Sequence, residues 1–295
     1  MGSSEPIVGI IGGSGLGEAL GAQEGEARHV QTPFGAPSAP LTLTRWNGVQ
    51  IVILQRHGPG HVFGPARVPY RANVYALKAV GATHIIASGA TGSLRDEIRP
   101  GDLVIPDQVI DKTQGRPSTF YEKAAVHVEM AEPFCPVMRR WLTEAGRRLD
   151  GTTVHEQGTY VCMEGPAFST RAESLMHRAW DADLIGMTCM PEAKLAREAE
   201  IAYALISLPT DYDCWRAHDR QSPGEDLLEE ILGNLQRATQ CSIALIREAL
   251  SDVTMLTGQA CPAHDALRRA IWTDKSRIAP DEIERLKILW GRHFV

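Results

Sequence analysis

Short apolar runs alternate along the chain with longer segments whose apolar residues recur at helical spacing. The short runs predict strands over 7–11, 41–44, 50–54, 83–87, 159–163, 183–187 and 201–208. The range 102–110 predicts one or two strands interrupted by Pro106. Helical spacing predicts helices over 68–80, 136–149, 170–180, 191–199 and 224–250, and helical character over 252–295. Strands that alternate with helices predict an α/β sheet with helices on both faces.

The bulk composition is that of an ordinary globular protein. The 295 residues, 43% hydrophobic and 22% charged, allow one large α/β domain or two small ones. The net charge of −6 and the lack of a Lys/Arg run argue against nucleic acid as a partner. The apolar stretch 7–12 is too short for a signal sequence or a membrane span. We therefore expect a cytoplasmic protein with no membrane contact.

The cysteines indicate neither a zinc motif nor a disulfide framework. They stand at positions 135, 162, 189, 214, 241 and 261. No two of them form a CxxC or CxxxC pair, so we expect no metal site. Free, buried thiols are the expected state, and disulfides are the alternative if the source is a hyperthermophile.

Two glycine-rich segments follow predicted strands. Gly12-Gly13-Ser14-Gly15 follows the strand over 7–11, and Ser88-Gly89-Ala90-Thr91-Gly92-Ser93 follows the strand over 83–87. Small residues with free N–H groups at a strand end suit a phosphate or a sugar, although a simple tight turn explains either segment equally well. The first segment is no dinucleotide fingerprint, because Glu18 or Leu20 stands where the third glycine is needed.

Two further segments offer groups for an anion and a planar ring. Arg56 and His57 follow the strand over 50–54, and His61 lies four residues beyond His57. A guanidinium is well suited to phosphate, and His57 can donate a further hydrogen bond; a surface Arg–His pair is the alternative. Phe168 follows a Gly-Pro turn and offers a ring that can stack on a base, with core packing as the alternative.

The segment Thr210-Asp211-Tyr212-Asp213-Cys214-Trp215 follows the predicted strand over 201–208. Two carboxylates two residues apart at a strand end can point into one site, and one of them can hold a proton through a raised pKa. Purine chemistry needs such a proton, because negative charge builds on the base as the glycosidic bond breaks. A solvated acidic turn is the alternative interpretation of this segment alone.

Taken together, these segments resemble the 5'-methylthioadenosine phosphorylases of the purine nucleoside phosphorylase superfamily. The similar segments are GIIGGSGL (9–16), TPFGAPS (32–38), RHGPGH (56–61), GSLRDEIRPGDLVIPDQVID (92–111), RPSTFY (116–121), MAEPFCP (130–136), EGPAFSTRAES (164–174) and TDYDCW (210–215). Their order and spacing cover roughly residues 7–250 of the chain.

The resemblance implies a nucleoside phosphorylase fold, in which a single α/β domain over 1–295 surrounds a central mixed sheet, with 250–295 as a less certain helical tail. It implies phosphorolysis of methylthioadenosine to adenine and 5-methylthioribose 1-phosphate, in methionine and purine salvage. The implied partners are a small-molecule nucleoside and inorganic phosphate as co-substrate, with no metal and no organic cofactor. The implied assembly is a homotrimer or a dimer of trimers.

The resemblance also implies a role for individual residues. The phosphate site comprises Ser14, Arg56, His57, the backbone of Gly89 and Ala90, and Thr188. The nucleoside site comprises Met187 at the sugar, Phe168 and Ser169 at the purine, His61 at the 5' substituent, and His127 from the neighbouring subunit. Asp211 acts at N7, and Asp213 faces the 6-amino group.

Two positions depart from the family pattern. Gly89 stands where the family often has a threonine that reaches phosphate, so Ser88 or Thr91 compensates or phosphate binds more weakly. Gly224 stands where a bulkier apolar residue often lines the methylthio pocket, which suggests a roomier 5' pocket.

Three alternatives stay open at this point. A 6-oxopurine phosphorylase acting on methylthioinosine, inosine or guanosine is disfavoured, because Asp211 and Asp213 are both carboxylates and an ionised carboxylate repels a 6-oxo oxygen. A non-catalytic nucleoside-binding protein on the same scaffold is a second alternative. A dinucleotide-dependent oxidoreductase is a distant third.

Overall fold

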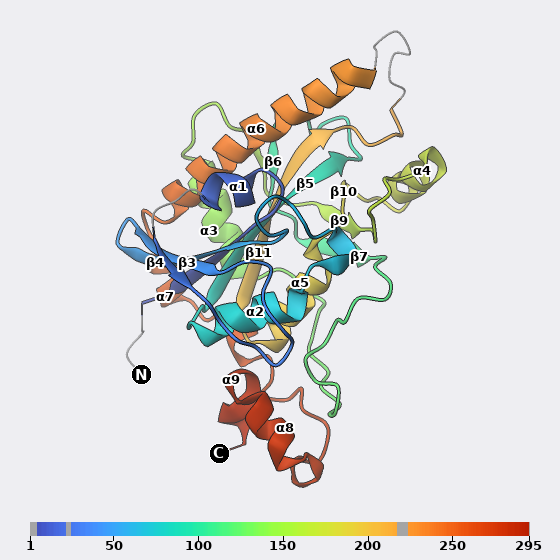
Figure 1. Ribbon diagram of the computed structural model, residues 1–295. Helices are drawn as coiled ribbons and strands as arrows, with labels where there is room; N and C mark the ends of the chain where they lie inside the picture. The colour runs from blue at the N-terminus through green and yellow to red at the C-terminus, as the bar shows by residue number, and fades with distance from the viewer. Residues whose placement is uncertain (1–4, 22–24, 217–223, 295) are drawn as a thin grey trace.

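A computed structural model of the chain describes residues 5–21, 25–216 and 224–294. Their centre is one mixed sheet with β2, β3, β4, β1, β5, β10, β9 and β7 in this order, while β11 pairs with β5 and β6, and β6 pairs with β8 (Figure 1). The strands are β1 (Ile7–Gly12), β2 (Glu26–Arg28), β3 (Leu41–Trp46), β4 (Val49–Gln55), β5 (His84–Ser93), β6 (Leu103–Val104), β7 (Gln108–Asp111), β8 (Val154–His155), β9 (Thr159–Cys162), β10 (Leu184–Gly186) and β11 (Ala202–Asp211). The predicted α/β architecture with a central mixed sheet is confirmed.

Helices cover both faces of this sheet (Figure 1). Those on one face are α1 (Leu16–Gly21), α3 (Pro136–Gly146), α6 (Gly224–Ala249) and α7 (Thr254–Gly258). Those on the other face are α2 (Tyr70–Ala79), α5 (Cys189–Glu198) and α9 (Lys287–Trp290). The remaining helical elements are α4 (Arg171–Ala179), α8 (Pro280–Arg285) and the 3-10 turns η1 (Pro65–Arg67), η2 (Pro262–Asp265), η3 (Lys275–Arg277) and η4 (Gly291–His293).

Each face has its own hydrophobic core, because successive side chains of a strand point to opposite faces of the sheet. In β1, Val8 and Ile10 join the core under α3 and α6, whereas Ile11 joins the core under α2 and α5. In β5, Ile86 joins the core under α3 and α6, and Ile85 joins the core under α2 and α5. The central strands are apolar on both sides for this reason, as their continuous apolar sequence indicates.

β5 and β11 are longer than the sequence pattern predicts. Residues 88–93, which we expected to form a loop, are the second half of β5, and β11 extends past 208 to Asp211. Most residues in these two extensions are small or polar, so the sequence there lacks the apolar run that predicts a strand. Their backbones nevertheless pair, because β11 and β10 provide partners for residues 88–93. The prediction of a loop over 88–93 was therefore wrong, and tertiary context overrides the local preference.

The other predicted helices and strands are found within a few residues of their expected bounds. The hairpin turn between β3 and β4 has positive φ angles at both Asn47 and Gly48, as a type I′ turn requires. The short elements α1, β2 and β8 carry too few residues for a periodic pattern and are not predicted. In the described ranges, no helix is long and apolar enough to cross a membrane.

Candidate active site

Several of the predicted site segments lie at one edge of the sheet. The neighbouring strands β4, β1, β5 and β11 run parallel, so their carboxyl ends meet at this edge. These ends carry residues 13–15, 56–57, 88–93 and 210–213. This is the edge at which open α/β sheets bind ligands. The fold therefore brings together segments that are far apart in the sequence.

The glycine-rich turn after β1 packs directly against Arg56. A Cβ atom at Gly13 would lie 2.6 Å from Arg56 Nη1 and 2.6 Å from the carbonyl oxygen of Ser88, so the turn accepts no larger residue there. Gly15 has a φ of +79°, and a Cβ atom there would lie 2.6 Å from a side-chain oxygen of α6. Ser14, between the two glycines, is half-buried. The turn is thus fixed between Arg56 and α6.

Arg56 is fully buried and forms a bidentate ion pair with Glu192 of α5. Its Nε and Nη2 atoms each donate to a carboxylate oxygen at 2.9 Å, and Nη1 donates to the Ser88 carbonyl at 2.6 Å. Tyr203 donates a further hydrogen bond to Glu192 at 2.8 Å. Burial opposes the charge on Arg56, but the adjacent Glu192 carboxylate outweighs it and raises the pKa of Arg56. Arg56 is therefore a fixed positive charge at the site.

His57 is held in one orientation and is neutral. Its Nδ1 atom lies 2.7 Å from the carbonyl oxygen of Phe63. Nδ1 must carry the proton to donate this bond, so Nε2 carries the lone pair. Burial, reinforced by the charge on Arg56, lowers the pKa of His57 to about 4. The exposed ring of His61 stacks on it, with centroids 4.3 Å apart.

The second half of β5 faces the start of α5. A Cβ atom at Gly89 would lie 3.3 Å from Thr188 Oγ1, so the two residues are in contact. The buried hydroxyls of Ser88 and Thr91 find no hydrogen-bond partner among the residues that the structure describes. Ala90 is half-buried. This stretch offers small side chains and buried hydroxyls, and a ligand oxygen can satisfy such groups.

The end of β11 carries the two predicted carboxylates. Asp211 pairs with Gly92 in the β5–β11 ladder, and its Oδ1 accepts from the Thr210 hydroxyl at 2.7 Å. Asn234 of α6 donates to the Thr210 carbonyl at 2.8 Å and ties the strand end to that helix. Asp213 is buried, and its Oδ2 has no hydrogen-bond partner within the described part of the chain. A ligand N–H group is a suitable partner for such an oxygen.

Arg116 joins the segment after β9 to the segment at the start of α5 through hydrogen bonds to backbone carbonyls. Its Nη1 donates to the carbonyls of Met187 and Met190, both at 2.8 Å. Its Nη2 lies 3.4 Å from the carbonyl of Met163 and also donates to that of Glu164. One guanidinium therefore holds Met187 beside the segment that leads to Phe168.

Phe168, Ser169 and His127 lie nearer the molecular surface. Ser169 adjoins the carboxylate segment, because Cys214 Sγ donates to its carbonyl at 3.2 Å. Phe168 is 85% exposed, which removes core packing as an explanation for it. His127 is also exposed, and its ring lies 4.7 Å from that of Trp272.

Two organising residues were not among those predicted from the sequence. Glu192 stands in α5 together with the charged residues Lys194, Arg197 and Glu198, so the sequence does not mark it as buried. The sequence does not mark Arg116 either, since its partners, backbone carbonyls and the Glu164 carboxylate at 3.2 Å, belong to segments distant in sequence. The surroundings of Gly224 lie outside the described residues, so the prediction of a roomier 5' pocket stays a prediction.

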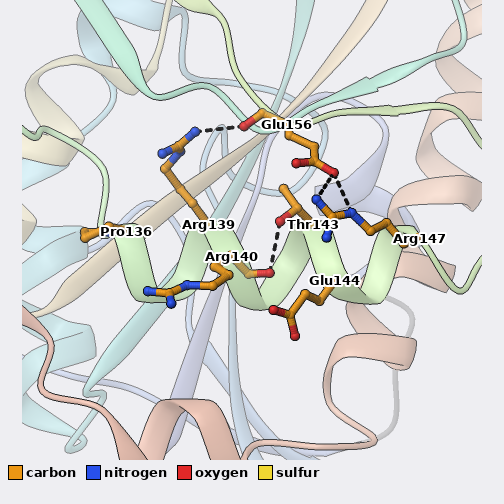
Figure 2. A pocket seen from close by; sticks show the side chains of 7 residues that line it. All are labelled: Pro136, Arg139, Arg140, Thr143, Glu144, Arg147 and Glu156. Carbon is orange, nitrogen blue, oxygen red and sulfur yellow. Dashed lines mark hydrogen bonds and ion pairs between the residues drawn. The ribbon is translucent and has the colours of Figure 1, made fainter.

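An open pocket elsewhere on the surface is distinct from this site (Figure 2). It lies along α3, and Arg139 and Arg147 there both bond Glu156. Its lining residues are Pro136, Arg139, Arg140, Thr143, Glu144, Arg147 and Glu156. None of the predicted site residues belongs to it.

Comparison with known proteins gives the family. Residues 7–251 match the model of the phosphorylase superfamily. The S-methyl-5'-thioadenosine phosphorylase of Geobacter sulfurreducens is 46% identical over 98% of this chain and 99% of its own length. That of Emericella nidulans is 40% identical over 99% of this chain and 84% of its own length.

Solved structures that resemble this chain belong to the same family as these relatives. A methylthioadenosine phosphorylase from an antarctic soil metagenomic library superposes with a TM-score of 0.85 and 42% identity, covering 97% of this chain and 99% of that one. A mutant adenosine/methylthioadenosine phosphorylase from Schistosoma mansoni in complex with methylthioadenosine superposes with a TM-score of 0.81 and 36% identity. The match covers 91% of this chain and 99% of that one. The chain therefore belongs to the phosphorylase superfamily and, within it, to the S-methyl-5'-thioadenosine phosphorylases.

Proposed function

We propose that this protein cleaves 5'-methylthioadenosine with inorganic phosphate to give adenine and 5-methylthioribose 1-phosphate. The observation that carries the proposal is the buried Asp213 carboxylate with an unsatisfied oxygen, at the same sheet edge as the fixed charge of Arg56. Phosphorolysis of an amino purine nucleoside needs both features, because one substrate is an anion and the 6-amino group of the base needs an acceptor that orients it.

The phosphate half of the site consists of Ser14, Arg56, His57, the backbone of Gly89 and Ala90, and Thr188. Arg56 supplies charge, and the contact between Gly89 and Thr188 supports a small anion between β5 and α5. His57 is neutral with its lone pair on Nε2, so it accepts a hydrogen bond from a protonated phosphate oxygen. This role replaces the donor role that the sequence suggested.

The nucleoside half places the base between Phe168 with Ser169 and the carboxylates, and the sugar near Met187. Asp211 acts on N7, and Asp213 accepts from the 6-amino group, which supplies the partner that Oδ2 lacks in the described chain. His61 approaches the 5' substituent. The oxocarbenium-like transition state needs positioning and charge stabilisation rather than a covalent intermediate.

We also propose that the protein is a homotrimer, or a dimer of trimers, in which His127 enters the site of a neighbouring subunit. The exposure of Phe168, 85%, and of Trp272 beside His127, 71%, supports an interface over these residues. Large apolar side chains exposed to this extent in the isolated chain are suited to a partner surface.

The decisive experiment measures release of adenine from methylthioadenosine by the purified protein with and without phosphate. We expect release only with phosphate. Release without phosphate indicates a hydrolytic nucleosidase, and tight binding with no turnover indicates a nucleoside-binding protein.

The base preference has its own test in kcat/KM for methylthioadenosine against methylthioinosine. The 6-amino substrate should be strongly preferred, and Asp213→Asn should shift the balance toward the 6-oxo substrate, because an amide also donates. A large preference of the unaltered protein for the inosine analogue would contradict the proposal.

A further inference from the structure

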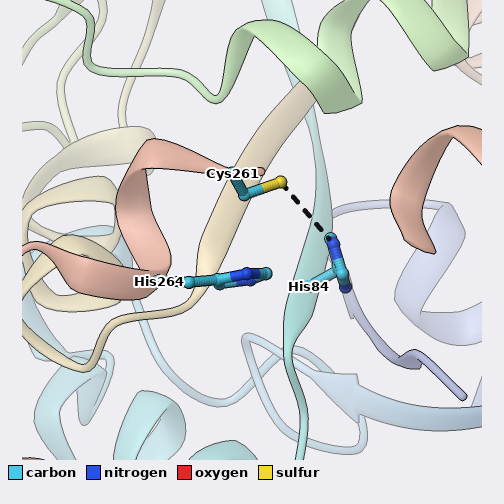
Figure 3. Close-up of side chains that lie close together, drawn as sticks. All are labelled: His84, Cys261 and His264. Atoms are coloured by element: carbon cyan, nitrogen blue, oxygen red, sulfur yellow. Dashed lines mark hydrogen bonds between the residues drawn. The ribbon is translucent and has the colours of Figure 1, made fainter. Parts of the chain in front are cut away.

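A cluster of two histidines and one cysteine lies at the opposite end of β5 from the candidate active site (Figure 3). His84 begins β5, whereas Cys261 and His264 lie in and next to η2, near the C-terminus. One ligand atom from each of the three residues lies within 4.8 Å of the other two. Cys261 Sγ is 3.8 Å from His84 Nε2, and the two histidine rings are nearly perpendicular, at 82°.

Thr83 contacts both imidazole rings. Its hydroxyl lies 2.8 Å from His84 Nδ1 and 3.3 Å from the Ile7 carbonyl. The Thr83 carbonyl accepts from His264 Nε2 at 2.9 Å. Each ring thus has one nitrogen hydrogen-bonded to Thr83, and its other nitrogen is left for a ligand. Histidines that bind metal ions are oriented in this way by a hydrogen bond from the second ring nitrogen.

The chemistry of the three groups suits a borderline-soft metal ion. His84 and Cys261 are buried, and His264 is half-buried. Cys135 Sγ lies 3.3 Å from Cys261 Sγ, within reach to donate its S–H proton to a Cys261 thiolate. In tetrahedral zinc sites the bond lengths imply a sulfur–nitrogen separation of about 3.5 Å. The observed separation of 3.8 Å needs only a small side-chain adjustment.

We propose that His84, Cys261 and His264 bind one zinc ion through two imidazole nitrogens and one thiolate, with water as the fourth ligand. Nitrogen and sulfur ligands select zinc over magnesium or calcium. The thiol proton of Cys261 is released to solvent on binding, and the half-buried His264 provides the route of entry. Since the cluster stands away from the carboxyl end of β5, the ion takes no part in phosphorolysis and holds the C-terminal segment against the sheet.

The sequence carries only part of this site. Cys261 and His264 are three residues apart, a spacing common among zinc ligands, but His84 is 177 residues from Cys261. Our expectation of no metal site rested on the lack of close cysteine pairs and took no account of this Cys–His pair. It takes the fold to bring the start of β5 next to η2.

The test is metal titration of the full-length protein after dialysis against a chelator, with Zn²⁺ and with Co²⁺ as a spectroscopic probe. We expect one ion per chain, a thiolate-to-cobalt charge-transfer band in the near ultraviolet, and a rise in Tm with Zn²⁺. Cys261→Ser should abolish the charge-transfer band, and His264→Ala should weaken Zn²⁺ binding by about tenfold or more. Cys241→Ser and His29→Ala, which alter residues outside the cluster, should change neither result.

Circular dichroism and phosphorolytic activity show whether each variant is folded. If Cys261→Ser fails to fold, His264→Ala decides the matter, because His264 is only half-buried. The proposal is overturned if the unaltered protein binds neither ion, or if folded cluster variants bind both as the unaltered protein does. It is equally overturned if the cobalt spectrum lacks a thiolate band.

Discussion

Glu192 touches Arg56 with both carboxylate oxygens, so a single buried residue sets the position of the main positive charge at the site. Glu192→Gln leaves that charge without its counter-ion, which typically costs about 3–5 kcal/mol of stability for a buried pair. If Glu192 positions Arg56 for phosphate, KM for phosphate should rise by about tenfold or more, with a smaller change in KM for the nucleoside. Steady-state kinetics with each substrate varied in turn measure both.

Glu129→Gln is the matched control for this prediction. Glu129 pairs with Arg197 at 3.0 Å, but its side chain is 63% exposed, so the loss should be below about 1 kcal/mol. Equal changes in the two KM values of Glu192→Gln would mean that Glu192 has only a structural role.

Glu198 gives a prediction about pH. Burial raises the pKa of Glu198 to about 7 from an ordinary value of 4.5, although the N–H group of Phe120 donates to it at 2.8 Å. The folded chain thus keeps a proton that the unfolded chain loses, and this stabilising contribution disappears as pH rises from about 4.5 through about 7. By pH 8, ionisation of Glu198 lowers the free energy of unfolding by about 3 kcal/mol. Glu198→Gln still accepts from Phe120 and should gain stability relative to the unaltered protein between pH 5 and pH 8.

Urea unfolding at pH 5 and at pH 8 measures the free energy of unfolding of both proteins. The protein concentration is kept fixed, because assembly makes stability depend on concentration. The exposed Glu97→Gln serves as control. A difference between Glu198→Gln and the unaltered protein that is the same at both pH values would contradict the assignment.

At the scale of elements, periodicity predicts the helices and the apolar strands well, because burial on one or both faces leaves a regular pattern. It fails in residues 88–93 and 209–211, where small and polar residues are held in strands by their neighbours. These are also residues of the candidate site. Local sequence cannot show such pairing, since the partner strands lie about ninety residues or more away in the chain. The site residues were recognised as a set of motifs, whereas their supports, Glu192 and Arg116, emerge only from packing.

The pairing of β5 with β11 predicts the effect of filling Gly92. A Cβ atom there would lie 3.0 Å from Asp213 Cβ and 3.1 Å from Ile185 Cγ2, so Gly92→Ala must displace one of them. Because a shift of about 1 Å at a reacting group can cost about a hundredfold, kcat/KM for the nucleoside should fall by about ten- to a hundredfold. Gly258→Ala, with open space around it, should leave the kinetics unchanged. Unchanged kinetics in Gly92→Ala would show that Asp213 is not placed as we propose.

For the whole molecule, the sheet with two cores explains why one edge is free for chemistry. Helices cover both faces, so the carboxyl ends of the parallel strands are where polar groups can gather (Figure 1). The sequence predicts this layering, but a single chain cannot show which exposed residues complete the site of another. Phe168 and His127 are both exposed, and their proposed roles depend on assembly.

Mixed assemblies test that dependence. If His127 acts in the site of a neighbour, a chain with Asp211→Ala still lends its His127, and a chain with His127→Ala still provides Asp211. Co-expressing the two variants with different affinity tags and purifying on both tags gives assemblies in which some sites contain both groups. Their activity per chain should then exceed that of either variant alone. If His127 instead serves its own chain, no site regains both residues, and the mixed assembly should show only the average of the two parents. Analytical ultracentrifugation of the same samples establishes whether they are trimers or hexamers.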